Sequence, residues 1–432
     1  YETNGLVMPL LATIFLTYCW WGRYIPGALG IKGYSFNRLM ATCYSTDGVF
    51  GTSIGVSSTY VILFCIFGAF LEGTGGVKLF IDISSALMGK FRGGAAKVSI
   101  IASALMGMIN GSAAANTVTT GAFTIPLMKK SNYESTYAAA VCAVASTGGQ
   151  IMPPIMGAAA FIMAENVGVP YGEIALAAMI PALLYYMSLF LSVDHESVRL
   201  NMKGMRREEL PRVKVVMQEV GHLSLSLIVL IVMLVVFKTS AIKAGLYASY
   251  TALIVALLRK NTRYGWKTFL NMLANGGKSV VGVASACACA GVITGVLSLT
   301  GLGGKIANVI LAVAQGKLLL AMIMVMVVCV ILGMGLPTTA SYIIASSVTA
   351  GPLIQLGLDP LVANMFIFYY ACLSAITPPV AIAAYGAAGI ADCNASRAGF
   401  KAWWLGLVAF IVPYMFAYSP ELLLISQRGP LY

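Results

Sequence analysis

Two polar, helix-breaking stretches interrupt apolar sequence and carry the groups best suited to binding a solute. They are residues 110–117 (NGSAAANT) and 333–339 (GMGLPTT). Each is followed by a second break that ends in two prolines, at residues 146–154 (STGGQIMPP) and 374–379 (SAITPP). Paired interrupted segments in two halves of a membrane protein are typical of a transporter's binding site. The pattern therefore predicts a secondary transporter.

These breaks offer neutral oxygen atoms and free backbone groups. Non-helical backbone at membrane depth is tolerated only beside protein or a water-lined cavity, and half-helix amides attract anions while carbonyls and hydroxyls suit sodium. We predict substrate-binding residues at Asn110, Ser112, Asn116, Gly149, Thr338, Thr339 and Ser374. We predict sodium ligands at Gly111, Ser112, Thr147, Gly148, Gly333, Gly335, Thr338 and Thr377.

None of these candidates is charged, and none is expected to be catalytic. Neutral oxygen ligands hold sodium weakly enough for release, which favours sodium over a proton as the coupling ion. No resident cofactor is expected. The alternative is that the small residues only permit close helix packing. The ordered recurrence of the landmarks, and prolines that delete backbone hydrogen bonds, argue against packing alone.

The composition indicates a polytopic helical membrane protein. Hydrophobic residues make up 59% of the chain and charged residues 10%, too few to cover a soluble globule of this size. The net charge of +12 comes from Lys and Arg in short loops between apolar runs, as the positive-inside rule predicts. We therefore expect no nucleic-acid partner.

The remaining reactive residue types do not suggest another chemistry. Most cysteines lie in apolar runs, where thiols pack as small hydrophobes, so we expect no disulfide framework. The two histidines complete no metal site. Glu72, Asp82, Glu165 and Asp392 are interpreted as anchors at span ends or the interface, and residues 194–196 as a solvated loop. No leader with a small-residue cleavage site is present, so no signal peptide is expected.

The landmarks also divide the chain into two repeats. Gly75, Gly111 and Pro153 correspond to Gly303, Gly335 and Pro378 at a nearly constant offset. Spans are expected from Leu6 to Trp21, at about 56–71, 174–193, 223–237, 245–258 and 280–299, with amphipathic pieces near residues 34–44, 76–92 and Tyr264. We predict a first repeat (1–193), a basic cytoplasmic loop with a linker helix (194–243), and a second repeat (244–432).

Each repeat is expected to contain a re-entrant hairpin and a broken transmembrane helix. The hairpins fall at about 97–130 and 305–356, and the broken helices at about 135–166 and 361–391. Each repeat crosses the membrane an even number of times, so one linker helix inverts the second repeat. The predicted fold is therefore an all-α polytopic membrane protein with two inverted-topology repeats, whose hairpin tips meet near the midplane.

At these residues the sequence resembles the large membrane subunit of tripartite ATP-independent periplasmic (TRAP) transporters, particularly TAXI-type permeases. The resemblance lies in the strings GAFLE (68–72), GMINGSA (107–113), TTGAFTIPLM (119–128), STGGQIMPP (146–154) and GMGLPT (333–338). It implies an elevator-type carrier with a mobile transport domain and a fixed scaffold. It also implies sodium-driven uptake of an organic anion, most simply a carboxylate.

The same resemblance implies partners and a location. A soluble TAXI-type periplasmic binding protein would deliver the substrate, and a small membrane subunit, separate or fused upstream, would accompany this chain in the bacterial inner membrane. Three alternatives stay open at this stage: a stand-alone sodium- or proton-coupled carboxylate carrier, a membrane-embedded enzyme, and a structural assembly subunit. The enzyme would need a nucleophile with a base or a metal set, which the breaks lack.

Overall fold

The computed structural model describes residues 7–27, 30–206, 208 and 210–425, and these residues form helices and no strands. Leu6, where the first span was expected to begin, lies outside them. The helices of the first half are α1 (Val7–Trp21), α2 (Phe36–Cys43), α3 (Thr52–Val56), α4 (Ile62–Gly73), α5 (Gly76–Met88), α6 (Gly94–Asn110), α7 (Ala113–Lys130), α8 (Ser135–Gly148), α9 (Ala158–Val167) and α10 (Tyr171–Arg199).

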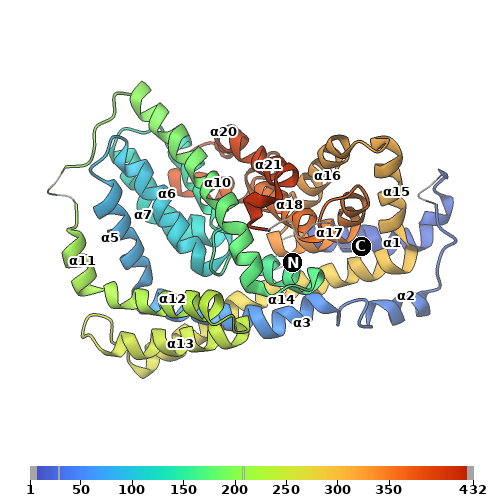
Figure 1. Cartoon of the computed structure of the whole chain (residues 1–432), viewed down its shortest axis with the longest axis horizontal. Helices are drawn as coiled ribbons and strands as arrows, with labels where there is room; N and C mark the ends of the chain where they lie inside the picture. The colour runs from blue at the N-terminus through green and yellow to red at the C-terminus, as the bar shows by residue number, and fades with distance from the viewer. Residues whose placement is uncertain (1–6, 28–29, 207, 209, 426–432) are drawn as a thin grey trace.

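The middle and second half of the chain continue the pattern. Their helices are α11 (Val213–Glu219), α12 (Ser224–Ile231), α13 (Ala241–Leu257), α14 (Trp266–Thr300), α15 (Leu302–Ala314), α16 (Leu318–Gly333), α17 (Thr338–Gln355), α18 (Pro360–Leu373), α19 (Ile382–Ala391), α20 (Ala395–Gly406) and α21 (Val412–Tyr418). In Figure 1, α5, α6 and α7 lie toward one end of the molecule, and α15 and α16 toward the other.

Four helical segments of the described chain are long and apolar enough to cross a membrane: Thr52–Gly73, Tyr171–Arg199, Trp266–Thr300 and Ala395–Tyr418. The pair Val213–Glu219 and Gly221–Val236 would form a fifth span if counted together, although it bends by 67°. Several other apolar helices are only 10–17 residues long. Interrupted helices of this length must satisfy their end groups inside the protein.

The start of the second half differs from the sequence expectation. We expected an amphipathic piece near Tyr264 and a separate span at 280–299, but Tyr264 lies in the turn before α14 and one continuous helix covers Trp266–Thr300. No proline interrupts this stretch. Gly276, within it, contacts α4 closely, since a Cβ there would lie 3.1 Å from the Cα of Ile66. That glycine permits helix packing.

The second predicted hairpin contains an additional helix. We assigned residues 305–356 to the hairpin. In the structure, residues 305–314 belong to α15, which ends at Ala314 before a turn at Gln315 and Gly316. The pair that follows is α16 and α17, joined by residues 334–337. In the first half the corresponding pair is α6 and α7, joined at Gly111 and Ser112.

The short helices that follow the two proline breaks pack across the halves. Helix α19 lies against α7 and α8 of the first half, and α9 lies against α17 and α18 of the second. Lys129 at the end of α7 donates a 2.9 Å hydrogen bond to the carbonyl of Ala391, the last residue of α19. A cation beside a helix C-terminus stabilises the exposed carbonyls. The paired helices and broken helices therefore form one interlocked body.

Residues 194–196, which we expected in a solvated loop, lie instead in the last turns of α10. Asp194 accepts hydrogen bonds from Lys97 at 2.6 Å and from Arg92 at 2.7 Å. The Lys97 side chain is only 6% exposed and also lies over the Phe190 ring. The sequence interpretation failed because the buried partner, Lys97, belongs to α6 and is distant in the chain.

Replacing Asp194 with Asn should destabilise the fold, because the buried Lys97 ammonium would lose its counter-charge. We expect a loss of about 1–3 kcal/mol, less than for a fully buried pair since Asp194 is 28% exposed. The measurement is the free energy of unfolding in detergent. Glu196→Gln is the control, because its partner Arg199 is 66% exposed and such pairs contribute little. Equal losses in both variants would contradict the assignment.

Candidate functional site

The first hairpin tip is a tight turn that only glycine can form. Gly111 has φ +57°, and a Cβ there would lie 2.2 Å from the carbonyl oxygen of Met156. The Asn110 side-chain oxygen accepts a 3.4 Å hydrogen bond from the backbone amide of Ser112. The Ser112 hydroxyl caps α7 by accepting from the amide of Ala115. Side-chain caps of this kind satisfy amides at a helix start.

The first proline break, residues 149–157, is held by backbone and tyrosine contacts. A Cβ on Gly107 would lie 2.2 Å from the Cα of Gly149, so α6 and the break meet backbone to backbone. The Gly157 amide donates to the carbonyl of Gln150 at 2.8 Å. The Tyr171 hydroxyl donates to the carbonyl of Pro154 at 2.9 Å. These contacts replace hydrogen bonds that a continuous helix would have made.

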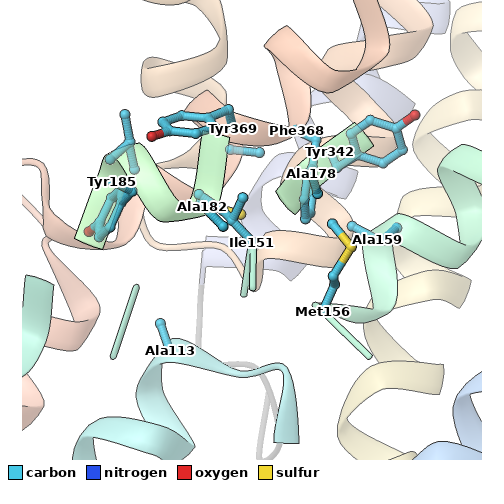
Figure 2. Packing of buried hydrophobic residues seen from close by; sticks show 14 of the residues in the cluster. Ala113, Ile151, Met156, Ala159, Ala178, Ala182, Tyr185, Tyr342, Phe368 and Tyr369 are labelled. Atoms are coloured by element: carbon cyan, nitrogen blue, oxygen red, sulfur yellow. The ribbon is translucent and has the colours of Figure 1, made fainter. Parts of the chain in front are cut away.

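An aromatic layer covers this break on one side. Figure 2 shows Ile151 between Ala113 and the Tyr369 ring, with Tyr185 on one side of it and Met156, next to Ala159, on the other. The two rings meet edge to face, with centroids 6.2 Å apart. A Cβ on Gly148 would lie 2.4 Å from the Tyr185 ring, so Gly148 allows that ring to approach the helix end. The broken segment is therefore fixed by packing as well as by hydrogen bonds.

The second proline break, residues 377–381, has a matching organisation. The Tyr385 hydroxyl donates to the carbonyl of Pro379, as Tyr171 does to Pro154. The Ser374 hydroxyl contacts the carbonyl of Gly333 at 3.1 Å, which joins this break to the end of α16. In both breaks the prolines are joined by cis peptide bonds.

A cavity of about 540 Å³ lies where the two tips converge. The first tip, where α6 meets α7, contributes Asn110, Gly111 and Ser112 to its lining. The second tip, where α16 meets α17, contributes Gly335, Thr338 and Thr339. Helices α4 and α14 form another wall, contributing Glu72, Asn275 and Ser279. The lining contains no Lys, Arg or His. Its polar groups are therefore hydroxyls, amides and backbone, with Glu72 as the single ionisable acid.

Gln150 joins the two halves at this cavity. Its side-chain amide donates to the Thr338 hydroxyl at 2.8 Å and to the Gly111 carbonyl at 3.4 Å. The Thr338 hydroxyl also lies 3.1 Å from the Gln150 side-chain oxygen. One side chain from the first break thus contacts the first tip and the second tip. This is a direct polar link between segments far apart in the sequence.

The other predicted site residues lie outside the lining of this cavity. They are Asn116, Thr147, Gly148, Gly149, Gly333, Ser374 and Thr377, all buried. Asn116 donates to the Ser103 carbonyl at 2.8 Å and approaches the Ser146 carbonyl at 3.5 Å. The Thr147 hydroxyl donates within α8, and the Thr377 hydroxyl donates to the carbonyl of Leu373, the last residue of α18. These residues connect the hairpin arms to the breaks behind the cavity.

Several buried oxygen atoms behind the cavity lack a hydrogen-bond partner within the described residues. In the first half they are Asn116 Oδ1, Thr117 Oγ1 and Ser146 Oγ. In the second half Ser341 Oγ has none, and it lies beside Gly333, since a Cβ on that glycine would come within 2.7 Å of it. Buried polar atoms are normally paired. Each half therefore presents oxygen atoms able to accept a ligand such as a cation.

The cavity lining also includes polar residues that were missed as site candidates from the sequence, among them Glu72, Gln150, Asn275 and Ser279. Gln150 follows the predicted Gly149 directly, and Glu72 ends the GAFLE string, so local signals existed for both. Asn275 and Ser279 are polar residues of α14 that precede the predicted span at 280–299. Their position against the cavity depends on the packing of α14 on α4, which the sequence pattern does not specify.

Comparison with known proteins identifies the class to which this fold and cavity belong. Residues 5–428 match the family model described as "Tripartite ATP-independent periplasmic transporter, DctM component". The chain belongs to this family, the TRAP transporter large permeases. Its relatives are transporter permeases rather than enzymes, and the family resides in the inner membrane and works with a periplasmic binding protein and a small subunit.

Individual relatives are distant but extend over most of the chain. The 2,3-diketo-L-gulonate TRAP transporter large permease protein YiaN of Escherichia coli (strain K12) is 25% identical over 84% of this chain and 85% of its own. The C4-dicarboxylate TRAP transporter large permease protein DctM of Vibrio cholerae is 23% identical over 87% and 88%. The Alcanivorax borkumensis YdaH transporter shares the fold, with TM-score 0.62, 13% identity and coverage of 96% and 98%.

The Gln150–Thr338 link can be tested by a double-mutant cycle. Gln150→Leu and Thr338→Val should each lower the free energy of unfolding, and together by less than the sum, with a coupling of about 1 kcal/mol. Thermal or denaturant unfolding in detergent provides the measurement. Thr251→Val is the control partner for Gln150→Leu, because its exposed hydroxyl bonds only within α13. Strict additivity of the Gln150 and Thr338 changes would rule out the link.

Proposed function

We propose that this chain carries out sodium-driven uptake of a small organic anion, a carboxylate, delivered by a periplasmic binding protein. The observation that carries the proposal is the cavity between the two tips, lined by hydroxyl, amide and backbone groups from both halves, with Glu72 as its one carboxyl group and no basic side chain. The named relatives act on 2,3-diketo-L-gulonate and C4-dicarboxylates, which supports a carboxylate as the substrate class.

Sodium as coupling ion is supported by the chemistry of the buried groups. A carboxylate substrate in a cavity without Lys, Arg or His needs another positive partner, because an isolated anion is costly away from water. The partnerless oxygens of Thr117, Ser146 and Ser341 can contribute to coordinating a hard cation. Sodium bound behind the tips would supply positive charge beside the substrate and couple its entry to the ion gradient.

An elevator mechanism with two inverted repeats is supported by the packing. In Figure 1, α6 and α7 lie toward one end of the molecule, and α16 lies on the other side of its centre. With α8, α9, α18 and α19 the pairs α6–α7 and α16–α17 form the interlocked body that contains both breaks. We propose that this body is the transport domain, with the pairs as re-entrant hairpins, and that α4, α13 and α14 belong to the scaffold. The cavity lies at their boundary.

The proposed assembly follows the family and the sequence strings. We propose that the binding protein is of the TAXI type, because the strings GAFLE and STGGQIMPP resemble those of TAXI-type permeases. A small membrane subunit completes the transporter in the bacterial inner membrane, where this chain crosses several times. Substrate then reaches the cavity from the periplasmic side and leaves toward the side of the basic loops.

Sodium dependence is tested by flux in proteoliposomes containing the assembled transporter, with candidate carboxylates as solutes. Thr117→Val and Ser146→Ala remove partnerless oxygens, so the sodium concentration for half-maximal uptake should rise about tenfold, equivalent to ~1.4 kcal/mol of binding. Ser188→Ala is the control, because its hydroxyl bonds within α10. Uptake driven by a proton gradient and indifferent to sodium would overturn the coupling assignment.

Dependence on the binding protein is tested separately. Uptake by the same proteoliposomes should be at least tenfold lower without the periplasmic protein, because the substrate would then reach the cavity only from free solution. The measurement compares initial rates with and without the added protein at one substrate concentration. A stand-alone carrier would give equal rates in both conditions, and that result would reject the proposed delivery route.

A further inference from the structure

A basic turn connects α13 to α14 and is separate from the transport cavity. It comprises residues 259–267 and contains Arg259, Lys260, Arg263 and Lys267. The chain has no Asp or Glu between residues 220 and 358. Within the described residues none of these four cations forms an ion pair. Their charge is therefore available to an anion from outside the chain.

One donor at this turn is buried and unused. Nη1 of Arg259 has no hydrogen-bond partner in the described part of the chain. His222 contacts the same turn, with its Nε2 3.0 Å from the Thr262 hydroxyl. The Thr262 hydroxyl donates to the Ala256 carbonyl at 2.8 Å, so it accepts from His222. A buried donor without a partner indicates a missing acceptor.

A shallow cavity of about 350 Å³ opens at the end of the basic turn and the start of α14. It is lined by Tyr264, Gly265, Trp266 and Phe269. The Trp266 and Phe269 rings stack with centroids 5.5 Å apart, and Trp266 is 72% exposed. The N-terminus of α14 begins here, and no side chain caps it. Exposed aromatic rings beside cations are typical of the membrane interface, and free helix amides favour an anion.

Apolar side chains lead away from the turn. Ile254, Leu257 and Leu258 are all exposed, and their spacing places them on one face of the last turns of α13. A ligand that fits the whole arrangement has a phosphate for the cations and amides and a hydrocarbon chain for this face. We propose that the basic turn binds the headgroup of an anionic phospholipid, with its acyl chain along α13.

This inference rests on the proposed membrane location of the chain and not on what it transports. Charge complementarity selects an anionic lipid. A zwitterionic headgroup has no net charge and would not neutralise the four cations of the basic turn. Arg263 also fixes the turn internally, because its Nε donates to the carbonyl of Leu257 at 2.8 Å. The exposed lysines, Lys260 and Lys267, are therefore the residues to change without disturbing the turn.

The test uses the purified full chain in detergent with phosphatidylglycerol or phosphatidylcholine added. Native mass spectrometry counts bound lipid, and thermal unfolding reports stabilisation. The parent should bind phosphatidylglycerol at least fivefold more than phosphatidylcholine and unfold at a higher temperature with it. Lys260→Gln/Lys267→Gln should lose most of this preference. Inorganic phosphate at the same concentration should give neither effect.

The matched control is Lys238→Gln/Lys243→Gln, which removes the same charge near the other end of α13. It should retain the preference of the parent. Thermal unfolding of the two double-lysine variants in phosphatidylcholine shows whether they are folded. Trp266→Leu is a second change, without loss of charge, that should also weaken lipid binding. Equal lipid binding by parent and Lys260→Gln/Lys267→Gln, or equal stabilisation by free phosphate, would overturn the lipid site. Because no substrate is used, a failure of the transport proposal leaves this result interpretable.

Discussion

Unpaired backbone at the helix breaks is the constraint on which the rest of the structure depends. Each break exposes carbonyls and amides that a continuous helix would have paired. In each break a tyrosine hydroxyl donates a hydrogen bond to one of these carbonyls. Tyr171 donates to the carbonyl of Pro154, and Tyr385 donates to that of Pro379. Asn116 binds the Ser103 carbonyl between the arms of the first helix pair. These partners let non-helical backbone persist deep in an apolar chain.

The same constraint explains why the cavity contains no basic side chain. The groups that hold the breaks are amides and hydroxyls. The same kinds of group line the space between the tips. A fixed Lys or Arg there would bind an anion strongly, but it would also be an unpaired charge whenever the cavity was empty. In the proposed cycle sodium enters and leaves with the substrate, which avoids that cost. Neutral ligands and a mobile cation are thus complementary parts of the proposed cycle.

The sequence was informative where local residues alone determine the backbone. Gly111 with φ +57° and Gly335 with φ +77° lie in the predicted turns, and the prolines of both breaks interrupt the predicted helices. Family membership, inferred from the longer strings, is confirmed. The assigned roles of individual site residues remain predictions. The structure adds that only some of them line the cavity.

The sequence was least informative where a contact depends on distant segments. Asp194 looked like part of a solvated loop because its partner Lys97 lies on another helix. Gln150 was read as part of a proline motif, and its role became visible only when the second tip was placed beside it. The continuous helix α14 was divided because a hydropathy pattern does not distinguish an amphipathic end from a separate helix. Each error concerns tertiary packing rather than helix propensity.

Packing between the two halves of the chain fixes the two tips relative to each other. If each half enclosed its own break, the two tips could move independently and the cavity would have no fixed shape. Instead α19 lies on α7 and α8, and α9 lies on α17 and α18, so neither break can shift without the other half's helices. Gln150 adds a polar contact at the centre of this arrangement. A domain built in this way can carry a bound solute as one rigid unit while its surroundings, rather than its ligands, change between the two sides.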